Sequence, residues 1–154
     1  MDKIPKVLFL SRGSASRGQI AEGFLRTLAG DQYIPFSAGT EASHVHPLAL
    51  DVMSEAGIDI SNQTPREVAS LFHESFHYVV VLCDEPRERY PVYPFTRNLI
   101  KWSVPDPEFL AADSAARKQA FRQVRDQMKD RVEDLIETMS QPRTAFANVR
   151  AAAA

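Results

Sequence analysis

Val7-Leu8-Phe9-Leu10-Ser11-Arg12-Gly13-Ser14-Ala15-Ser16-Arg17-Gly18 runs directly into Gln19-Ile20-Ala21-Glu22-Gly23-Phe24-Leu25-Arg26. This order predicts a buried strand, a loop of small residues closed by an arginine, and a helix. Small residues let backbone N–H groups turn into such a loop, and the helix N-terminus adds a positive dipole. Because Arg17 can also hold two oxygens of one anion, the stretch is typical of an oxyanion site. Its expected lining is Arg12, Gly13, Ser14, Ala15, Ser16, Arg17 and Gly18, and Ser11 stands where an attacking group would be placed.

Hydrophobic periodicity over the rest of the chain predicts alternating strands and helices. Strands are expected at Lys6–Leu10, Tyr33–Phe36, His77–Leu82 and Leu99–Trp102, and helices at Gly18–Leu28, at Pro47–Ala56 and from Asp113 or Ser114 to Met139. Pro35 favours an edge position for its strand. Thr64 and Glu67 have the spacing of a capping box, which predicts a short helix to about Phe72. The alternation predicts a parallel α/β sheet with ligands at the carboxyl ends of its strands, where residues 11–18 lie.

Five stretches occur in an order that is shared with a known family. They are Ser11 to Arg17, Ser37-Ala38-Gly39-Thr40, Gly57-Ile58-Asp59-Ile60, Val79 to Asp84, and Trp102-Ser103-Val104-Pro105-Asp106-Pro107. Over nearly the whole chain this pattern resembles the low-molecular-weight tyrosine phosphatases and the thioredoxin-coupled arsenate reductases, and it is nearer the reductases. The resemblance implies a flavodoxin-like three-layer sandwich: a four-stranded parallel sheet in the order 2-1-3-4 with helices on both faces. It implies one domain over residues 1–140, followed by an Ala-rich tail at 141–154, part of which we expect to be vector-derived or frayed.

The resemblance also assigns roles to individual residues. Ser11 stands at the family's nucleophilic cysteine, Arg17 at its oxyanion-binding arginine and Asp106 at its general acid. Phosphate, arsenate or sulfate is then expected in the loop, and a small oxyanion or a phosphorylated molecule is the expected substrate. A surface salt bridge is the alternative for Arg17, and an ordinary Asp-Pro turn is the alternative for Asp106. Whether Arg12 contacts substrate or points outward stays open.

Ser11 is a poor nucleophile on chemical grounds. Even a pKa shift of about 3–5 units would leave a serine hydroxyl protonated, so it would need an adjacent general base. Only His46 is a conceivable spatial neighbour. The serine is either a deliberate Cys→Ser change or a natural divergence. Because Ser14, Ser16 and Gly18 also depart from the residues that the family commonly carries, natural divergence is favoured.

Cys83, the only cysteine, is a candidate redox residue because it matches the cysteine that attacks the first one in the reductases. The reductase pattern has a further cysteine before a proline, where this chain has Tyr90 and Pro91. A relay of thiols therefore cannot run within this chain, and a small buried apolar residue is the preferred interpretation of Cys83. A thiol reductant is the partner that the reductase resemblance implies.

Three functions follow. The first is an arsenate reductase-like protein that binds phosphate or arsenate between Ser11 and Arg17 while its thiol chemistry is lost. The second is a tyrosine phosphatase whose nucleophilic cysteine has been changed to serine. The third is a non-catalytic regulator that binds an oxyanion or a phosphoprotein. The family consists of enzymes, but the chain as it stands is expected to be inactive.

Composition narrows the remaining classes. The 154 residues are 44% hydrophobic, which suffices for one core, and the net charge of −2 gives no reason to expect nucleic acid or an anionic membrane as partner. No apolar stretch could span a bilayer and no signal peptide is evident, and one cysteine fits a cytoplasmic location. The pairs His44/His46 and His73/His77 lie in a loop and at a junction between elements, so neither a metal nor another cofactor is expected.

Overall fold

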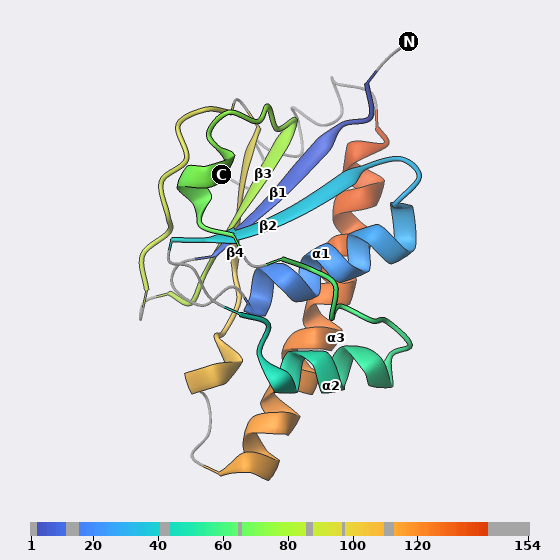
Figure 1. Ribbon diagram of the computed structural model, residues 1–154, viewed down its shortest axis with the longest axis vertical. Coiled ribbons are helices and arrows are strands. Elements are labelled where there is room, and N and C mark those ends of the chain that lie inside the picture. The colour runs from blue at the N-terminus through green and yellow to red at the C-terminus, as the bar shows by residue number, and fades with distance from the viewer. Residues whose placement is uncertain are drawn as a thin grey trace.

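The computed structural model describes residues 3–11, 16–40, 44–64, 66–85, 88–96, 98–109 and 113–141. Four strands form one parallel sheet in the order β2-β1-β3-β4. Their bounds are β1 Lys6–Ser11, β2 Ile34–Gly39, β3 Tyr78–Cys83 and β4 Leu99–Ser103. The α-helices of the described residues are α1 Ser16–Ala29, α2 Pro47–Glu55 and α3 Ser114–Met139, and Figure 1 shows them beside the sheet. The predicted α/β class and strand order are confirmed.

The central strand β1 explains why its sequence is apolar without interruption. Val7 and Phe9 enter the hydrophobic cluster on one face of the sheet, and Leu8 and Leu10 enter the cluster on the other face. All four side chains are fully buried. A parallel strand that is covered on both faces has this composition, whereas a half-exposed strand would alternate. Pro35 lies in β2, which is an edge strand as predicted.

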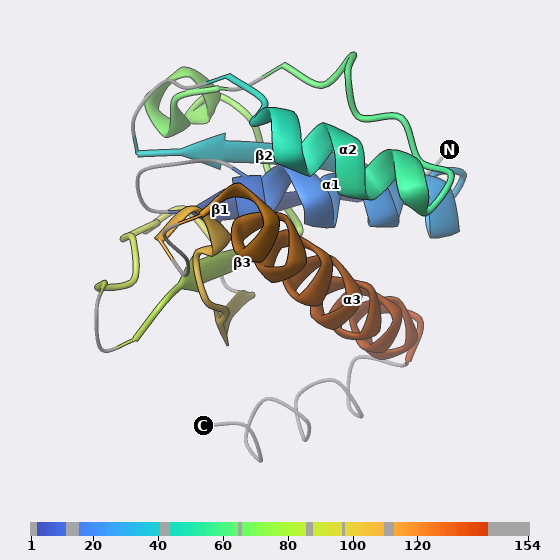
Figure 2. The same cartoon turned by 90° about the horizontal axis from the view of Figure 1, so that it is seen from below.

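The two faces of the sheet carry layers of unequal thickness. The larger cluster joins the sheet to α1, α2 and α3 through residues such as Phe24, Met53, Phe121 and Met128. The opposite face is covered by the short 3-10 helix η1 (Val68–Leu71) and by residues 88–96, which contribute Leu71 and Tyr93. In Figures 1 and 2 the α-helices lie on one side of the sheet, and the green η1 lies on the other side.

Local residues mark three of the helix ends. Asp113 accepts a hydrogen bond from Ala116 N at 2.8 Å and starts α3, as its position predicts. Gly57, with φ of +78°, follows α2 and takes the left-handed conformation that glycine tolerates best. The cap of α2 was not predicted: His46 Nδ1 accepts from Leu48 N at 3.1 Å.

The short helix predicted after Thr64 ends near Phe72 as expected, but its start and its cap are wrong. The chain forms only the single turn η1, its N-cap is Glu67 rather than Thr64, and no side-chain bond caps it. Glu67 instead pairs in a β-bridge with Gly39 at the end of β2, and Gly39 N donates to Arg66 O at 2.9 Å. Backbone pairing with the sheet edge therefore displaces the helix start toward Val68.

Candidate oxyanion site

Ser11 ends β1 at the carboxyl edge of the sheet, between Gly39 of β2 and Leu82 of β3. Its side chain is fully buried, and its Oγ has no hydrogen-bond partner among the residues that the structure describes. The four predicted lining residues Arg12, Gly13, Ser14 and Ala15 lie outside the described residues. The chain resumes at Ser16, the first residue of α1, so the helix N-terminus faces the same edge of the sheet.

Gly18, on the first turn of α1, lies against Ser11. A Cβ added to Gly18 would be 3.3 Å from Ser11 Oγ, 3.2 Å from Phe9 O and 3.4 Å from Ser37 Cβ. A side chain at this position would thus touch the hydroxyl of Ser11 and would fit only if its neighbours moved slightly. Glycine therefore leaves Ser11 without the hydroxyl contact that a serine at position 18 could provide.

Arg17 is the charged centre of the site. Its side chain is completely buried, and its Nη1 and Nη2 donate to Glu88 Oε1 at 2.8 Å and to Glu88 Oε2 at 3.2 Å. Nη1 also donates to the backbone carbonyl of Val104 at 3.1 Å. A surface salt bridge, the alternative for Arg17, is excluded by this burial. The arrangement holds the guanidinium at a fixed place beside the start of α1.

Asp106 lies on the other side of the same guanidinium. Its Oδ2 is 3.5 Å from Arg17 Nη2, its Oδ1 accepts from Glu108 N at 3.1 Å, and only 2% of the residue is exposed. Burial raises the pKa of the Asp106 carboxyl, against the opposing effect of Arg17. A carboxyl that keeps its proton to higher pH and lies beside a buried guanidinium could serve as a proton donor.

His46 does not serve Ser11. Its Nδ1 caps α2, its Nε2 lies 3.5 Å from Glu108 Oε1, and its ring stacks on Phe121 with centroids 4.9 Å apart. These contacts attach the turn after Asp106 to α2. Since Ser11 Oγ has no partner in the described part of the chain, no described side chain there accepts the proton of its hydroxyl.

Cys83 ends β3 and is also fully buried. Burial raises the pKa of its thiol, Glu88 and Glu85 raise it further, and Arg17 opposes them. A raised pKa reduces the fraction of reactive thiolate at neutral pH. Tyr90, at the position of the reductases' further cysteine, packs its ring under Lys101 Nζ at 5.4 Å. Cys83 therefore has the environment of an inert core residue.

A partly buried polar network connects α1 to its neighbours. Glu22 of α1 accepts from Ser37 Oγ of β2 at 2.8 Å and pairs with Arg26. Arg26 donates to Gln63 Oε1 at 2.7 Å, and Gln63 Nε2 donates to Gln19 O at 2.9 Å. These bonds tie α1 to β2 and to the segment after α2, and so fix the helix that carries Arg17 and Gly18.

Glu88 and Val104 are the site residues that sequence reasoning missed. Glu88 lies 71 positions from Arg17 and belongs to no local motif. One indication was available: with strand order 2-1-3-4, the acidic run after Cys83 leaves the sheet next to the end of β1. Backbone contacts such as that of Val104 O leave no trace in the sequence.

The model of the family "Low molecular weight phosphotyrosine protein phosphatase" matches residues 6–145 of the chain. The chain belongs to this family. The predicted resemblance is thereby confirmed.

Several relatives of the chain are arsenate reductases. The chain is 34% identical over 119 residues to an arsenate reductase of Halalkalibacterium halodurans, covering 77% of this chain and 86% of that protein. A solved structure described as an arsenate reductase in the phosphate binding state is 34% identical, with a TM-score of 0.75 and coverage of 88% and 99%. A thioredoxin-dependent arsenate reductase of Corynebacterium glutamicum is 27% identical, with a TM-score of 0.66 and coverage of 90% and 64%.

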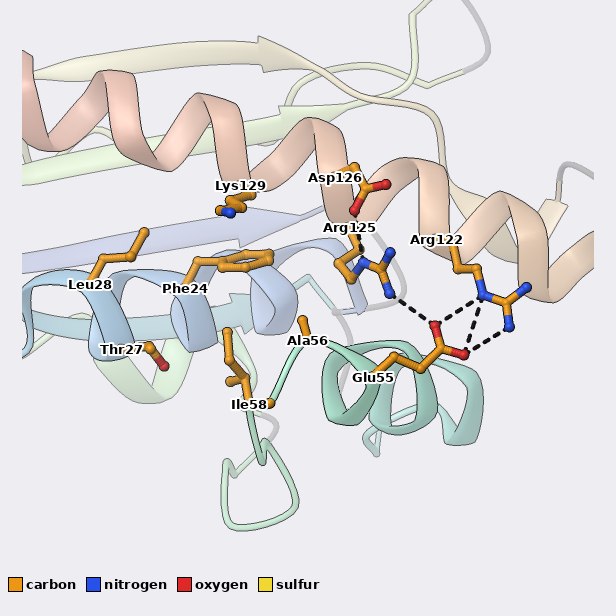
Figure 3. A pocket seen from close by; sticks show the side chains of 11 residues that line it. Phe24, Thr27, Leu28, Glu55, Ala56, Ile58, Arg122, Arg125, Asp126 and Lys129 are labelled. Atoms are coloured by element: carbon orange, nitrogen blue, oxygen red, sulfur yellow. Dashed lines mark hydrogen bonds and ion pairs between the residues drawn. The ribbon is translucent and has the colours of Figure 1, made fainter.

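A hollow of about 540 Å³ lies away from the phosphatase-family site, among α1, the end of α2 and α3 (Figure 3). Phe24, Leu28 and Ile58 contribute its apolar part. Glu55 accepts hydrogen bonds from both Arg122 and Arg125 at one end of it. These charges attach α2 to α3. The residues that line the hollow do not include Arg17, Cys83 or Asp106.

Among the residues that the structure describes, no group of three or more His, Cys, Asp or Glu residues could hold a metal ion. None of the helices there has an apolar run long enough to cross a membrane.

Proposed function

We propose that this chain binds a tetrahedral oxyanion, phosphate or arsenate, between Ser11 and Arg17 and carries out no thiol chemistry there. The observation that carries the proposal is Arg17, fully buried beside the N-terminus of α1 at the carboxyl edge of the sheet. A guanidinium and a helix N-terminus that meet at one place attract an anion. The backbone of residues 12–15 would supply the remaining donors.

The loss of thiol chemistry rests on three positions. Ser11 replaces the nucleophilic cysteine and has no proton acceptor among the described residues. Cys83 is buried with a raised thiol pKa. Tyr90 stands where the reductases carry a further cysteine. A thiol reductant of the kind named for the C. glutamicum relative would therefore find no internal disulfide to reduce, because the chain has a single cysteine.

Calorimetric titration with phosphate and with arsenate tests the binding. We expect saturable binding to the parent chain and a loss of about tenfold or more in Arg17→Lys, because lysine keeps the charge but cannot hold two oxygens in a fixed fork. Arg122→Lys, far from the loop, is the matched control. Equal affinity of the parent and Arg17→Lys would contradict a role for Arg17. If neither phosphate nor arsenate binds, the proposal is wrong.

A second candidate, a phosphatase that lacks only its nucleophile, is favoured by Asp106. Its buried carboxyl with a raised pKa lies 3.5 Å from Arg17, which is the environment a general acid needs. On this view Ser11→Cys alone restores turnover of an aryl phosphate. A chain that binds oxyanions but gains nothing from that change would instead be a regulator.

A further inference from the structure

The Glu88 carboxylate occupies the outer edge of the Arg17 guanidinium. Each terminal nitrogen of Arg17 donates to a different oxygen of Glu88, at 2.8 and 3.2 Å. The Glu88 side chain is only 11% exposed and that of Arg17 is not exposed at all. This bidentate geometry is the one that guanidinium groups use to hold phosphate and other oxyanions. Arg17 is thus already engaged with an anion that belongs to the chain itself.

The backbone fixes Glu88 in this position. Asp84 N donates to Glu88 Oε1 at 2.8 Å, and Glu88 N donates to Asp84 O at 2.7 Å. The turn that leaves β3 therefore closes on itself and directs the carboxylate at Arg17. Because Oε1 accepts from both Asp84 N and Arg17, the backbone at the end of β3 holds the carboxylate against the guanidinium.

The surroundings of Arg17 are rich in negative charge. Asp106 Oδ2 lies 3.5 Å from Nη2, and Asp84 Oδ2 accepts from Asp106 N at 3.4 Å. The carboxyl groups of Glu88 and Asp106 therefore both contact the guanidinium, and that of Asp84 lies next to Asp106. An arriving oxyanion must either bind donors of Arg17 beside these carboxyl groups or displace Glu88. In both cases the affinity of Arg17 for the oxyanion is reduced.

We propose that Glu88 is an affinity-determining residue that competes with the external oxyanion for Arg17. This inference rests on the proposed function, because it concerns how strongly the same site binds its ligand. Charges a few ångströms apart in a partly buried site interact strongly, so removing the Glu88 charge should tighten binding about tenfold. Glutamine keeps an oxygen that can accept from Arg17 and from Asp84 N, so the guanidinium stays in place.

Titration calorimetry with inorganic phosphate tests this inference on the parent chain, Glu88→Gln and Glu85→Gln. Glu85 is an exposed acid of the same turn, so its change removes an equal charge away from the guanidinium. We expect Glu88→Gln to bind phosphate about tenfold tighter than the parent, and Glu85→Gln to bind within about twofold of it. Thermal melting checks that each variant is folded.

The outcomes separate the two proposals. If the parent binds phosphate and Glu88→Gln binds equally or more weakly, the competition is wrong and the oxyanion site stands. If neither chain binds, both proposals are wrong. If Glu88→Gln is unfolded, Glu88→Asp replaces it: the aspartate withdraws the charge by one methylene, and tighter binding is again expected, with unchanged or weaker binding as the contradiction.

Discussion

The burial of Arg17 changes the energetic importance of its ion pairs. An arginine on a surface contributes little through its ion pairs, whereas a buried guanidinium that lost its partners would be costly. Glu88, Asp106 and the carbonyl of Val104 surround Arg17 and make its position permanent. Ser11, six positions earlier in the chain, is by contrast a buried hydroxyl with no described partner.

Asp106→Asn is expected to stabilise the fold at neutral pH. Burial raises the pKa of Asp106 in the folded state above its unfolded value, so the contribution of this carboxyl to stability is complete below the unfolded pKa and is lost as the pH rises through the folded one. Asparagine avoids that loss while still accepting from Glu108 N. We expect the melting temperature at pH 7 to rise by about 2–4 °C.

Melting curves of the parent, Asp106→Asn and the exposed control Asp31→Asn between pH 4 and 8 check this expectation. The advantage of Asp106→Asn should shrink on acidification, because the parent's own carboxyl then gains its proton. An advantage that grows at low pH would show that Asp106 is ionised and stabilising in the fold.

Among the elements, those whose pattern is local and continuous were predicted correctly. β1, β3, α1 and α3 follow from apolar runs and helical spacing, and Pro35 places β2 at the edge. The predicted helix after Thr64 starts later than expected because Glu67 pairs with Gly39, a long-range contact that outweighs a local capping pattern. Glu88 was missed for the same reason, since only the sheet order brings it to Arg17.

Asp113→Ala is expected to shorten α3 at its start. The Asp113 carboxylate accepts from Ala116 N at 2.8 Å, and loss of such a cap costs about 1 kcal/mol. Urea unfolding should therefore show a lower midpoint with an unchanged slope, whereas Asp130→Ala, at an exposed position within α3, should change the midpoint little. Equal effects of the two variants would show that the cap contributes nothing.

At the scale of the whole molecule, ion pairs join α2 to α3. Glu55 of α2 bonds to Arg122 and Arg125 of α3, and these bonds lower the pKa of Glu55 to about 2. A lowered pKa means that the contribution to stability is present above the unfolded value of 4.5 and is lost as the pH falls toward 2.

Glu55→Gln should accordingly melt below the parent at pH 7, and the difference should disappear as the pH falls from 4.5 toward 2. Glu133→Gln, whose partner Lys129 is 3.9 Å away and half-exposed, is the control and should change the melting temperature less. A deficit of Glu55→Gln that persists unchanged at the lowest pH would contradict the role of this ion pair in holding α2 to α3.

The most direct test of the account is the hydrolysis of a generic aryl phosphate by the parent chain and by Ser11→Cys, with Ser11→Cys/Arg17→Lys as the control. We predict no turnover by the parent, measurable turnover by Ser11→Cys, and its loss in the double variant, because Arg17 and Asp106 would then lie beside a thiol that can attack the phosphate. Turnover by the parent would contradict the claim that Ser11 is inert. The absence of turnover in Ser11→Cys would contradict the claim that the catalytic surroundings are intact.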